Sequence, residues 1–254
     1  MTVVERFHRL HDEFLLLPNA WDYASAAALA REGFPAVGTT SLGVAAASGV
    51  KDGACAARSQ TVALAGLLSG LPVPVSVDVE GGFSDDAGAV RELGAELAAL
   101  GVAGVNVEDG LPGGGLREVA HQARLVAAMR SSGLFVNART DTYWLEVERN
   151  STVDRLRAYV DAGADGVFVP GLAAEQDIAP IVAAVSVPLN VLFLPGRTNV
   201  QALPGFGVRR MSTGSFLFRA ALGAAVDAVR AVRRNSTPLT NDIPTYQQVQ
   251  ALMP

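Results

Sequence analysis

Acidic, amide and basic side chains follow one another at three points in the chain, each time at the end of a short apolar run. The runs end in Val-Asp-Val-Glu, Val-Asn-Val-Glu and Val-Asn-Ala-Arg. Residues two positions apart share one face of a β-strand, so each run would present a pair of polar side chains to the same side. The pairs are Asp78 with Glu80, Asn106 with Glu108, and Asn137 with Arg139. Their repetition at three strand ends predicts a single polar site.

The carboxylates at Asp78, Glu80 and Glu108 would repel one another unless a cation or a proton lay between them. Carboxylate oxygens without a cluster of His or Cys favour Mg²⁺, with Mn²⁺ as an alternative, over zinc. We therefore expect these three residues to hold a metal ion, and Arg139 to offer its donor fork to a substrate carboxylate. A divalent ion beside an arginine suits a reaction in which negative charge builds on the oxygen of a 2-oxo acid. The simpler alternative is that these are ordinary polar residues in surface loops.

The elements that must position these residues alternate along the chain. Short apolar or β-branched runs predict eight strands, at 15–19, 36–40, 73–78, 104–108, 134–139, 166–170, 188–191 and 208–212. Helical spacing predicts helices at 24–32, 56–68, 86–100, 116–131, 152–162, 174–185 and 216–234, an additional N-terminal helix at 3–14, and an ill-defined seventh barrel helix around 199–203. This alternation predicts an α/β fold, a single (β/α)₈ TIM barrel, whose chemistry belongs at the C-terminal strand ends. We expect one domain over 1–254, with the barrel at about 14–234 and a short tail at 235–254 outside it.

The composition excludes several classes of protein. Of 254 residues, 50% are hydrophobic, and the net charge is −5, which argues against a nucleic-acid-binding surface. Gly and Pro interrupt the longest apolar stretches, so we expect no membrane span. The single cysteine, Cys55, excludes an intrachain disulfide, and we interpret it as a packing residue. We expect a cytoplasmic protein, and we interpret His8 and His11 as surface residues.

Five segments carry a family resemblance: LPNAWDYASAAALAREGFPAVGTTSLGVAAASGVKD (17–52), VPVSVDVEGGFSDD (73–86), GVAGVNVEDG (101–110), FVNARTDTYW (135–144) and GVRRMSTGSFLFRAAL (207–222). In these segments and their spacing, the chain resembles the isocitrate lyase / phosphoenolpyruvate mutase superfamily, in particular its carboxyvinyl-carboxyphosphonate phosphorylmutase-like branch. The resemblance implies a (β/α)₈ barrel, Mg²⁺, and cleavage or formation of a C–C or P–C bond next to a 2-oxo acid or enolpyruvate. It also implies a homo-oligomer, either a dimer or a tetramer.

The resemblance assigns roles to matching positions. Asp78 would hold the metal directly or through water, with Glu80 and Glu108 as further members of the metal site. The catalytic residues would be Asp52, Arg139 and Glu108, with Asp52 on a gating loop after the second strand. Thr40, Ser41 and Leu42 would offer a hydroxyl and backbone N–H groups to a substrate carboxylate. The full substrate-binding set is Trp21, Thr40, Ser41, Leu42, Asn137, Arg139 and Asn190.

The loop after the fourth strand departs from the family pattern. Lyases of the superfamily carry Lys-Lys/Arg-Cys-Gly-His there and mutases carry a Lys and an Asn, whereas this chain reads Asp-Gly-Leu-Pro-Gly-Gly-Gly-Leu-Arg at 109–117. We expect a Mg²⁺-dependent lyase-type enzyme that cleaves a C–C or P–C bond of a small 2-oxo or 2-hydroxy carboxylate through a metal-stabilised enolate. Two alternatives stay open: phosphonate or oxaloacetate hydrolysis on the same platform, and an idle barrel that binds a carboxylate metabolite. Arg209 and Arg210, with Thr213-Gly214-Ser215, also resemble a phosphate cradle.

Overall fold

The strands form a parallel barrel, in a computed structural model that describes residues 1–236 and 243–253. They are β1 (Leu15–Leu17), β2 (Asn19–Ala20), β3 (Val37–Thr39), β4 (Val75–Asp78), β5 (Gly104–Glu108), β6 (Phe135–Arg139), β7 (Gly166–Val169), β8 (Leu189–Leu192) and β9 (Arg210–Ser212). Their order in the sheet is β1-β9-β8-β7-β6-β5-β4-β3-β2. Only Pro18, which has no N–H for a strand ladder, separates β1 from β2, so these two are halves of one barrel strand. Because β1 pairs with β9 and β2 pairs with β3, the sheet closes, and the predicted (β/α)₈ barrel is confirmed.

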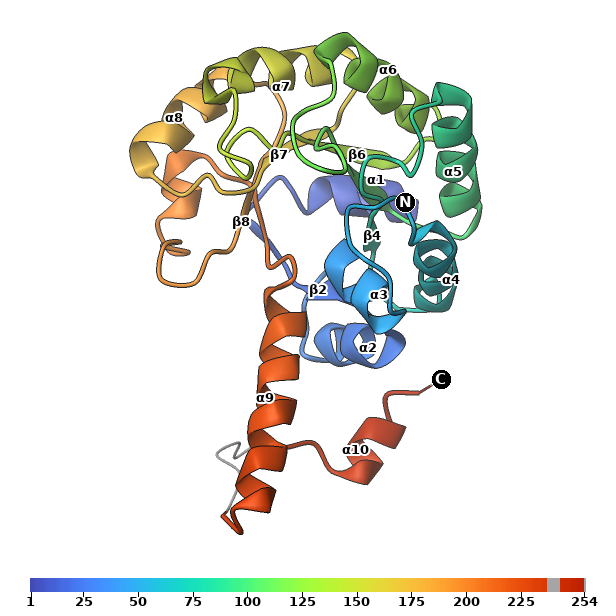
Figure 1. Cartoon of the computed structure of the whole chain (residues 1–254). Coiled ribbons are helices and arrows are strands. Elements are labelled where there is room, and N and C mark those ends of the chain that lie inside the picture. The colour runs from blue at the N-terminus through green and yellow to red at the C-terminus, as the bar shows by residue number, and fades with distance from the viewer. Residues whose placement is uncertain (237–242, 254) are drawn as a thin grey trace.

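Helices alternate with the strands and cover the outside of the barrel (Figure 1). They are α1 (Val3–Arg9), α2 (Tyr23–Arg31), α3 (Ser41–Ala47), α4 (Arg58–Leu68), α5 (Ala87–Ala99), α6 (Val119–Arg130), α7 (Thr152–Asp161), α8 (Glu175–Ala184), α9 (Phe216–Arg233) and α10 (Tyr246–Gln250). Two 3₁₀ turns, η1 (Arg149–Ser151) and η2 (Leu203–Phe206), complete the set. The sequence did not predict α3. It also predicted a helix around 199–203 where the chain forms only η2, because a proline at the start of this turn and glycines at 205 and 207 confine it to one turn.

Helix α1 and the turn after it close the N-terminal end of the barrel. The Phe7 ring is fully buried and packs edge-to-face on Phe135 of β6, with 5.2 Å between the ring centroids. The His11 ring stacks on Phe135 at 4.5 Å, and its Nδ1 lies 2.9 Å from the carbonyl oxygen of Phe7. With 5% of its surface exposed, His11 is buried, and its interpretation as a surface residue is wrong. The spacing of four residues after Phe7 brings both rings to the same side of a helical turn.

We expect His11 to make the fold sensitive to acid. Burial, helped by the positive charge of Arg210, lowers the pKa of His11 from 6.5 to about 3, so the folded protein keeps the ring neutral. The unfolded chain takes up a proton below pH 6.5, and stability therefore falls by about 1.4 kcal/mol per pH unit between 6.5 and 3. His11→Phe keeps a ring on Phe135 but cannot titrate. Urea unfolding at pH 8 and pH 5 should show a smaller difference in this variant than in the wild type. Equal differences would contradict the prediction.

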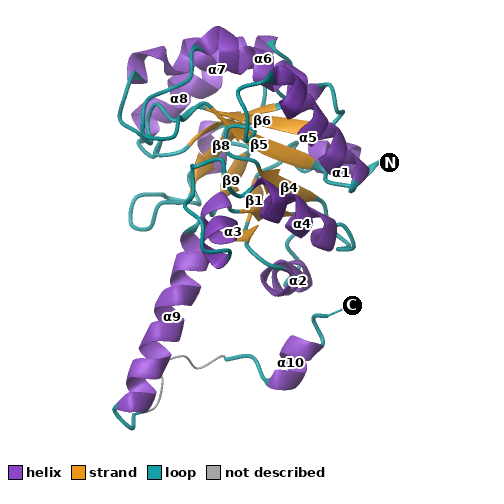
Figure 2. Cartoon of the chain, turned by 45° about the vertical axis from the view of Figure 1, so that its right-hand side comes forward, coloured by secondary structure: helices purple, strands orange, loops and turns teal. Residues whose placement is uncertain are grey.

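The last two helices extend beyond the barrel. Figures 1 and 2 show α9 projecting away from the strands, with α10 beyond the lower edge of the barrel. Helix α9 meets the barrel near its first turn, where Phe218 packs on Trp21 at 5.4 Å, and its later turns carry exposed apolar side chains. Residues 243–253 follow α9 and contain α10, whereas 237–242 and 254, which also belong to the predicted tail, lie outside the described residues. In the described part of the chain, no helix has the length and apolar character needed to cross a bilayer.

Candidate active site

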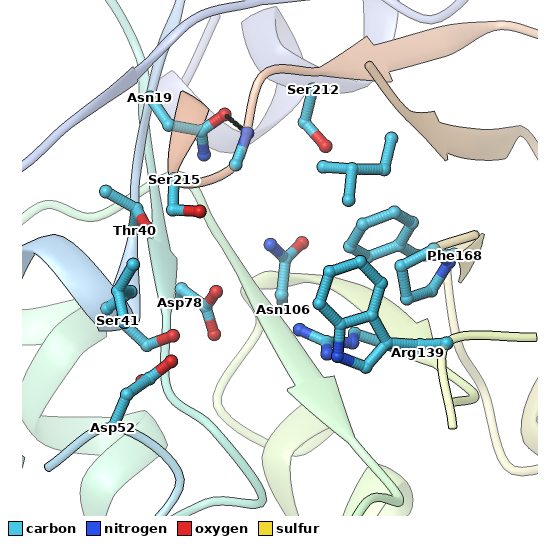
Figure 3. A pocket seen from close by; sticks show the side chains of 15 residues that line it. Asn19, Thr40, Ser41, Asp52, Asp78, Asn106, Arg139, Phe168, Ser212 and Ser215 are labelled. Atoms are coloured by element: carbon cyan, nitrogen blue, oxygen red, sulfur yellow. Dashed lines mark hydrogen bonds between the residues drawn. The ribbon is translucent and has the colours of Figure 1, made fainter. Parts of the chain in front are cut away.

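A cavity of about 100 Å³ lies at the C-terminal ends of the strands (Figure 3). This volume leaves room for a molecule of only a few non-hydrogen atoms. Seven of the residues predicted from the sequence line it: Thr40, Ser41, Leu42, Asp52, Asp78, Asn106 and Arg139. The structure thus brings together residues from β4, β5, β6, the start of α3 and the loop between α3 and α4.

Charged and hydroxyl groups face one another across this cavity. Figure 3 shows Asp52 and Ser41 on one side and Arg139 on the other, with Asp78 between them. A small dianion placed here would meet a guanidinium at one end and hydroxyl and backbone N–H donors at the other. The arrangement therefore suits a short molecule with carboxylate or carbonyl oxygens at both ends.

Two carboxylates fix the guanidinium of Arg139. Its Nη1 lies 2.6 Å from Oε2 of Glu108, and its Nε lies 2.6 Å from Oδ1 of Asp141. These two ion pairs fix the plane of the guanidinium. The Arg139 side chain is 15% exposed, and part of it lies on the cavity surface. Burial raises the pKa of Glu108 against the opposing effect of Arg139. Glu108 does not line the cavity and reaches it through Arg139.

Asp78 carries a half-buried carboxyl at the cavity surface. Its backbone N–H donates to Oγ1 of Thr39 at 2.9 Å, and its Oδ1 accepts the backbone N–H of Glu80 at 3.2 Å. Burial raises the pKa of Asp78 to about 6; Arg139 opposes the rise and the like charge of Asp52 adds to it. A cation bound at this carboxylate would compensate the cost of its charge.

The donor set fits Mg²⁺ with few protein ligands. Within residues 1–236 and 243–253, no three His, Cys, Asp or Glu side chains gather closely enough to hold a metal between them. Mg²⁺ commonly uses one or two protein carboxylates and takes its other ligands from water and substrate. Asp78 at the cavity surface, with Asp52 facing the same space, meets that requirement.

Glu80 points to the loop that carries Asp52. Its backbone is in the left-handed region, at φ 50°, and its Oε2 accepts the backbone N–H of Cys55 at 3.0 Å. The carboxyl is buried, and its Oε1 has no partner among the described residues. Burial raises the pKa of Glu80 to about 7, although the Cys55 hydrogen bond opposes this. The contact ties the end of β4 to a residue three positions after Asp52.

We expect the Glu80 contact to restrain this loop. Lys51 is the only lysine in the chain, so endoproteinase Lys-C cuts at one place, between 51 and 52. Losing a buried hydrogen bond costs about 1–3 kcal/mol, so Glu80→Ala should speed cleavage by about tenfold or more. Glu80→Gln keeps an acceptor for the Cys55 N–H and should stay near the wild-type rate.

The release of fragment 1–51 with time, followed by gel or mass spectrometry, measures the cleavage rate. Glu96→Ala, which removes an exposed carboxylate on α5, is the matched control. A Glu80→Ala rate equal to that of the control would show that the contact does not hold the loop.

Three other predicted residues lie outside the cavity lining. Trp21 packs on Phe218 of α9, as described above. Asn137 donates from Nδ2 to Oδ1 of Asn106 at 2.9 Å. Asn190 donates from Nδ2 to Oγ of Ser212 at 3.2 Å. Asn106 and Ser212 do line the cavity, so Asn137 and Asn190 contact it through these two side chains.

The sequence-based site residues missed part of the lining. Phe168 of β7 and Leu192 of β8 lie on the inward face of their strands, and the two-residue period of a strand would have found them. Trp144 follows β6 in a loop and carried no such signal. Of the suggested phosphate cradle, Gly214 and Ser215 line the cavity.

The two arginines of that suggestion lie elsewhere. Arg210 is buried in the barrel, and Arg209 lines a separate hollow near His11. The suggested phosphate cradle therefore has neither arginine at the cavity surface.

Comparisons with known proteins agree with this geometry. Residues 7–233 match the family described as phosphoenolpyruvate phosphomutase. The chain is 42% identical over 250 residues to an uncharacterized protein of Mycobacterium tuberculosis (strain ATCC 25618 / H37Rv), covering 96% of this chain and 95% of that protein. It is 30% identical over 198 residues to the 2-methylisocitrate lyase of Bacillus subtilis (strain 168), covering 72% of this chain and 65% of the relative. A crystal structure of phosphonopyruvate hydrolase with oxalate and Mg²⁺ has the same fold, with a TM-score of 0.86 at 20% identity, over 99% of this chain and 95% of that chain.

Proposed function

Because this chain belongs to the isocitrate lyase / phosphoenolpyruvate mutase superfamily, we propose that it is a Mg²⁺-dependent lyase-type enzyme. Its substrate would be a small 2-oxo or 2-hydroxy carboxylate in which a C–C or P–C bond is broken. The observation that carries this proposal is the placement of Asp78 and Arg139 in one cavity at the C-terminal strand ends. The reactions named for the relatives, on 2-methylisocitrate and phosphonopyruvate, support the same class of substrate.

Arg139 and the start of α3 would bind the two ends of the substrate. The fork of Arg139, held by Glu108 and Asp141, would donate to a carboxylate. The hydroxyl of Ser41, with the backbone N–H groups of Ser41 and Leu42, would donate to the oxygens at the other end. Donors fixed before the substrate arrives need no rearrangement as charge develops on these oxygens.

Asp78 would hold Mg²⁺, directly or through water, with Glu80 placed behind it. When bound, the ion would supply positive charge beside the oxygens of the substrate, where negative charge grows as the bond breaks. Asp52 would accept or return the proton at a carboxylate oxygen, because its loop borders the same cavity.

Hydrolysis is the second candidate. Residues 109–117 carry no Cys or His, and Gly110 pairs antiparallel with Leu116, so this loop folds back on itself as a tight hairpin. The acid that serves the lyases of the superfamily thus has no counterpart here, which favours attack by water on an oxaloacetate-like or phosphonopyruvate-like substrate.

A substrate panel separates these reactions from an idle barrel. Proton and phosphorus NMR would follow 2-methylisocitrate, oxaloacetate and phosphonopyruvate with the protein and Mg²⁺. We expect at least one to be consumed with Mg²⁺ and spared with EDTA, and the products distinguish lyase from hydrolase activity. Oxalate binding without any turnover would instead support a carboxylate-binding protein that has lost catalysis.

We also propose that the protein is a homo-oligomer. The projecting turns of α9 expose apolar side chains spaced three or four residues apart, at Leu222, Val226, Val229 and Val232. This spacing places them along one stripe of the helix. An exposed apolar stripe of this kind marks a surface that is covered in the working protein, and a second copy of the chain would cover it with an identical stripe.

Charges on this stripe should break the assembly. We expect the double variant Val226→Glu, Val229→Glu to run as a monomer of 26.3 kDa in light scattering after gel filtration, because two carboxylates would have to be buried against the partner. Arg230→Gln is the control, since it changes an exposed residue next to the stripe and lowers the net charge. A wild-type protein that is already a monomer would refute the proposal.

A further inference from the structure

A guanidinium lies in the centre of the barrel with few partners. Arg210 of β9 is 1% exposed, and its Nε and Nη1 have no hydrogen-bond partner among the described residues. Its Nη2 donates to Oδ1 of Asn106 at 3.2 Å, and the Phe7 ring lies on its other side, 5.8 Å from the guanidinium carbon. An unpaired buried cation is costly to the fold, so its presence calls for a role at the site above it.

Asn106 connects this guanidinium to the cavity. Its Oδ1 accepts two hydrogen bonds, one from Nδ2 of Asn137 and one from Nη2 of Arg210. The carboxamide therefore turns its carbonyl end towards the barrel interior. Its Nδ2 has no acceptor among the described residues, and Asn106 lines the cavity next to Asp78 (Figure 3).

Asn137 cannot fix this orientation without help. Two carboxamides that face each other can turn over together, because each carries both a donor and an acceptor. A guanidinium has donors only, so it can form a hydrogen bond with Asn106 only when the amide oxygen of Asn106 faces Arg210. Arg210 thus decides which end of the Asn106 amide reaches the cavity.

We propose that Arg210 is a positioning residue that holds Nδ2 of Asn106 towards the cavity as a donor to an oxygen of the bound carboxylate. This inference rests on the proposed function, because it takes from it that the ligand is a small carboxylate. It adds to Arg139 and Ser41 a third fixed donor at the cavity floor, and it explains why β9 carries a charged residue inside the barrel.

A double-mutant cycle on oxalate binding with Mg²⁺ tests this coupling. Arg210→Met should weaken binding about tenfold, because a mixed amide orientation loses one donor bond to a charged oxygen. Asn106→Ala should weaken it by a similar factor. The double variant should bind no more weakly than Asn106→Ala alone. Arg210→Lys, which keeps a donor without an acceptor, should restore part of the affinity. Additive effects in the double variant would overturn the proposal.

A measurement on the protein without ligand tests the role of Arg210 independently of the proposed function. The side-chain NH₂ signals of Asn106 in a ¹H–¹⁵N spectrum are assigned by their loss in Asn106→Asp. In Arg210→Met we expect these signals to shift or double, with most backbone signals unchanged. Unchanged Asn106 signals would overturn the role of Arg210 even where oxalate binds. A wild type that fails to bind oxalate would refute the proposed function instead.

Discussion

Replacing Arg139 with Gln should weaken oxalate binding in the presence of Mg²⁺ by about 100- to 1,000-fold. The estimate follows from the loss of a buried charged donor, which costs about 3–4 kcal/mol, at about 1.4 kcal/mol per tenfold. Arg139 is the guanidinium that lines the cavity, and its plane is fixed by Glu108 and Asp141. Isothermal titration calorimetry measures the change directly.

A second variant guards against unfolding. Arg139→Gln leaves two buried carboxylates without their cation, which destabilises a fold by about 3 kcal/mol or more. Arg139→Lys keeps the positive charge but loses the planar fork, so we expect near-native thermal stability with binding weakened about tenfold or more. If both Arg139→Lys and Arg139→Gln fold and bind oxalate as tightly as the wild type, Arg139 does not contact the ligand.

Asp78→Asn should abolish the dependence of oxalate binding on Mg²⁺. The amide keeps an acceptor for the N–H of Glu80 and nearly the same shape, so the fold should tolerate it. It removes the charge that would hold the ion, and we expect affinity in Mg²⁺ to fall by about 100-fold or more, to the value in EDTA. Asp227→Asn on α9, far from the cavity, is the matched control. Retention of a Mg²⁺ effect in Asp78→Asn would place the ion elsewhere.

Much of the fold could be predicted because strand periodicity is a local property. Runs such as those ending at Asp78 and Arg139 alternate apolar and polar residues, and the strands begin or end within a few residues of the predicted limits. The sequence pattern could not show the break at Pro18, which divides one barrel strand into two, or the short helix α3. It also could not show that α9 leaves the barrel, since apolar spacing looks the same whether a helix covers a core or a partner.

The sequence predicted those cavity residues whose side-chain direction is set by the strand backbone alone. Asp78 and Arg139 reach the cavity because each ends a strand on its inward face. Glu80 does not follow this rule, because its left-handed backbone ends the strand pattern and its carboxyl turns to Cys55. Glu108 turns to Arg139, a choice of side-chain rotamer that spacing does not determine.

Tertiary packing determines the surroundings of two further residues that the sequence analysis placed elsewhere. His11 was expected at the surface, yet the turn after α1 stacks it on Phe135. Arg210 was considered for a phosphate cradle, yet the inward face of β9 buries it below the cavity floor. In both cases the packing around the side chain, which residue type does not reveal, determined burial.

The most direct test is a calorimetric titration of oxalate, a planar mimic of the pyruvate enolate, into the wild-type protein with Mg²⁺ and then with EDTA. Lys-C digestion of the same samples reports whether ligand protects the Lys51 bond on the Asp52 loop. We expect oxalate to bind with Mg²⁺, to bind about 100-fold or more weakly with EDTA, and to slow the cleavage only in the sample with Mg²⁺. Absence of oxalate binding under both conditions would contradict this expectation and leave a barrel of this family without a working site.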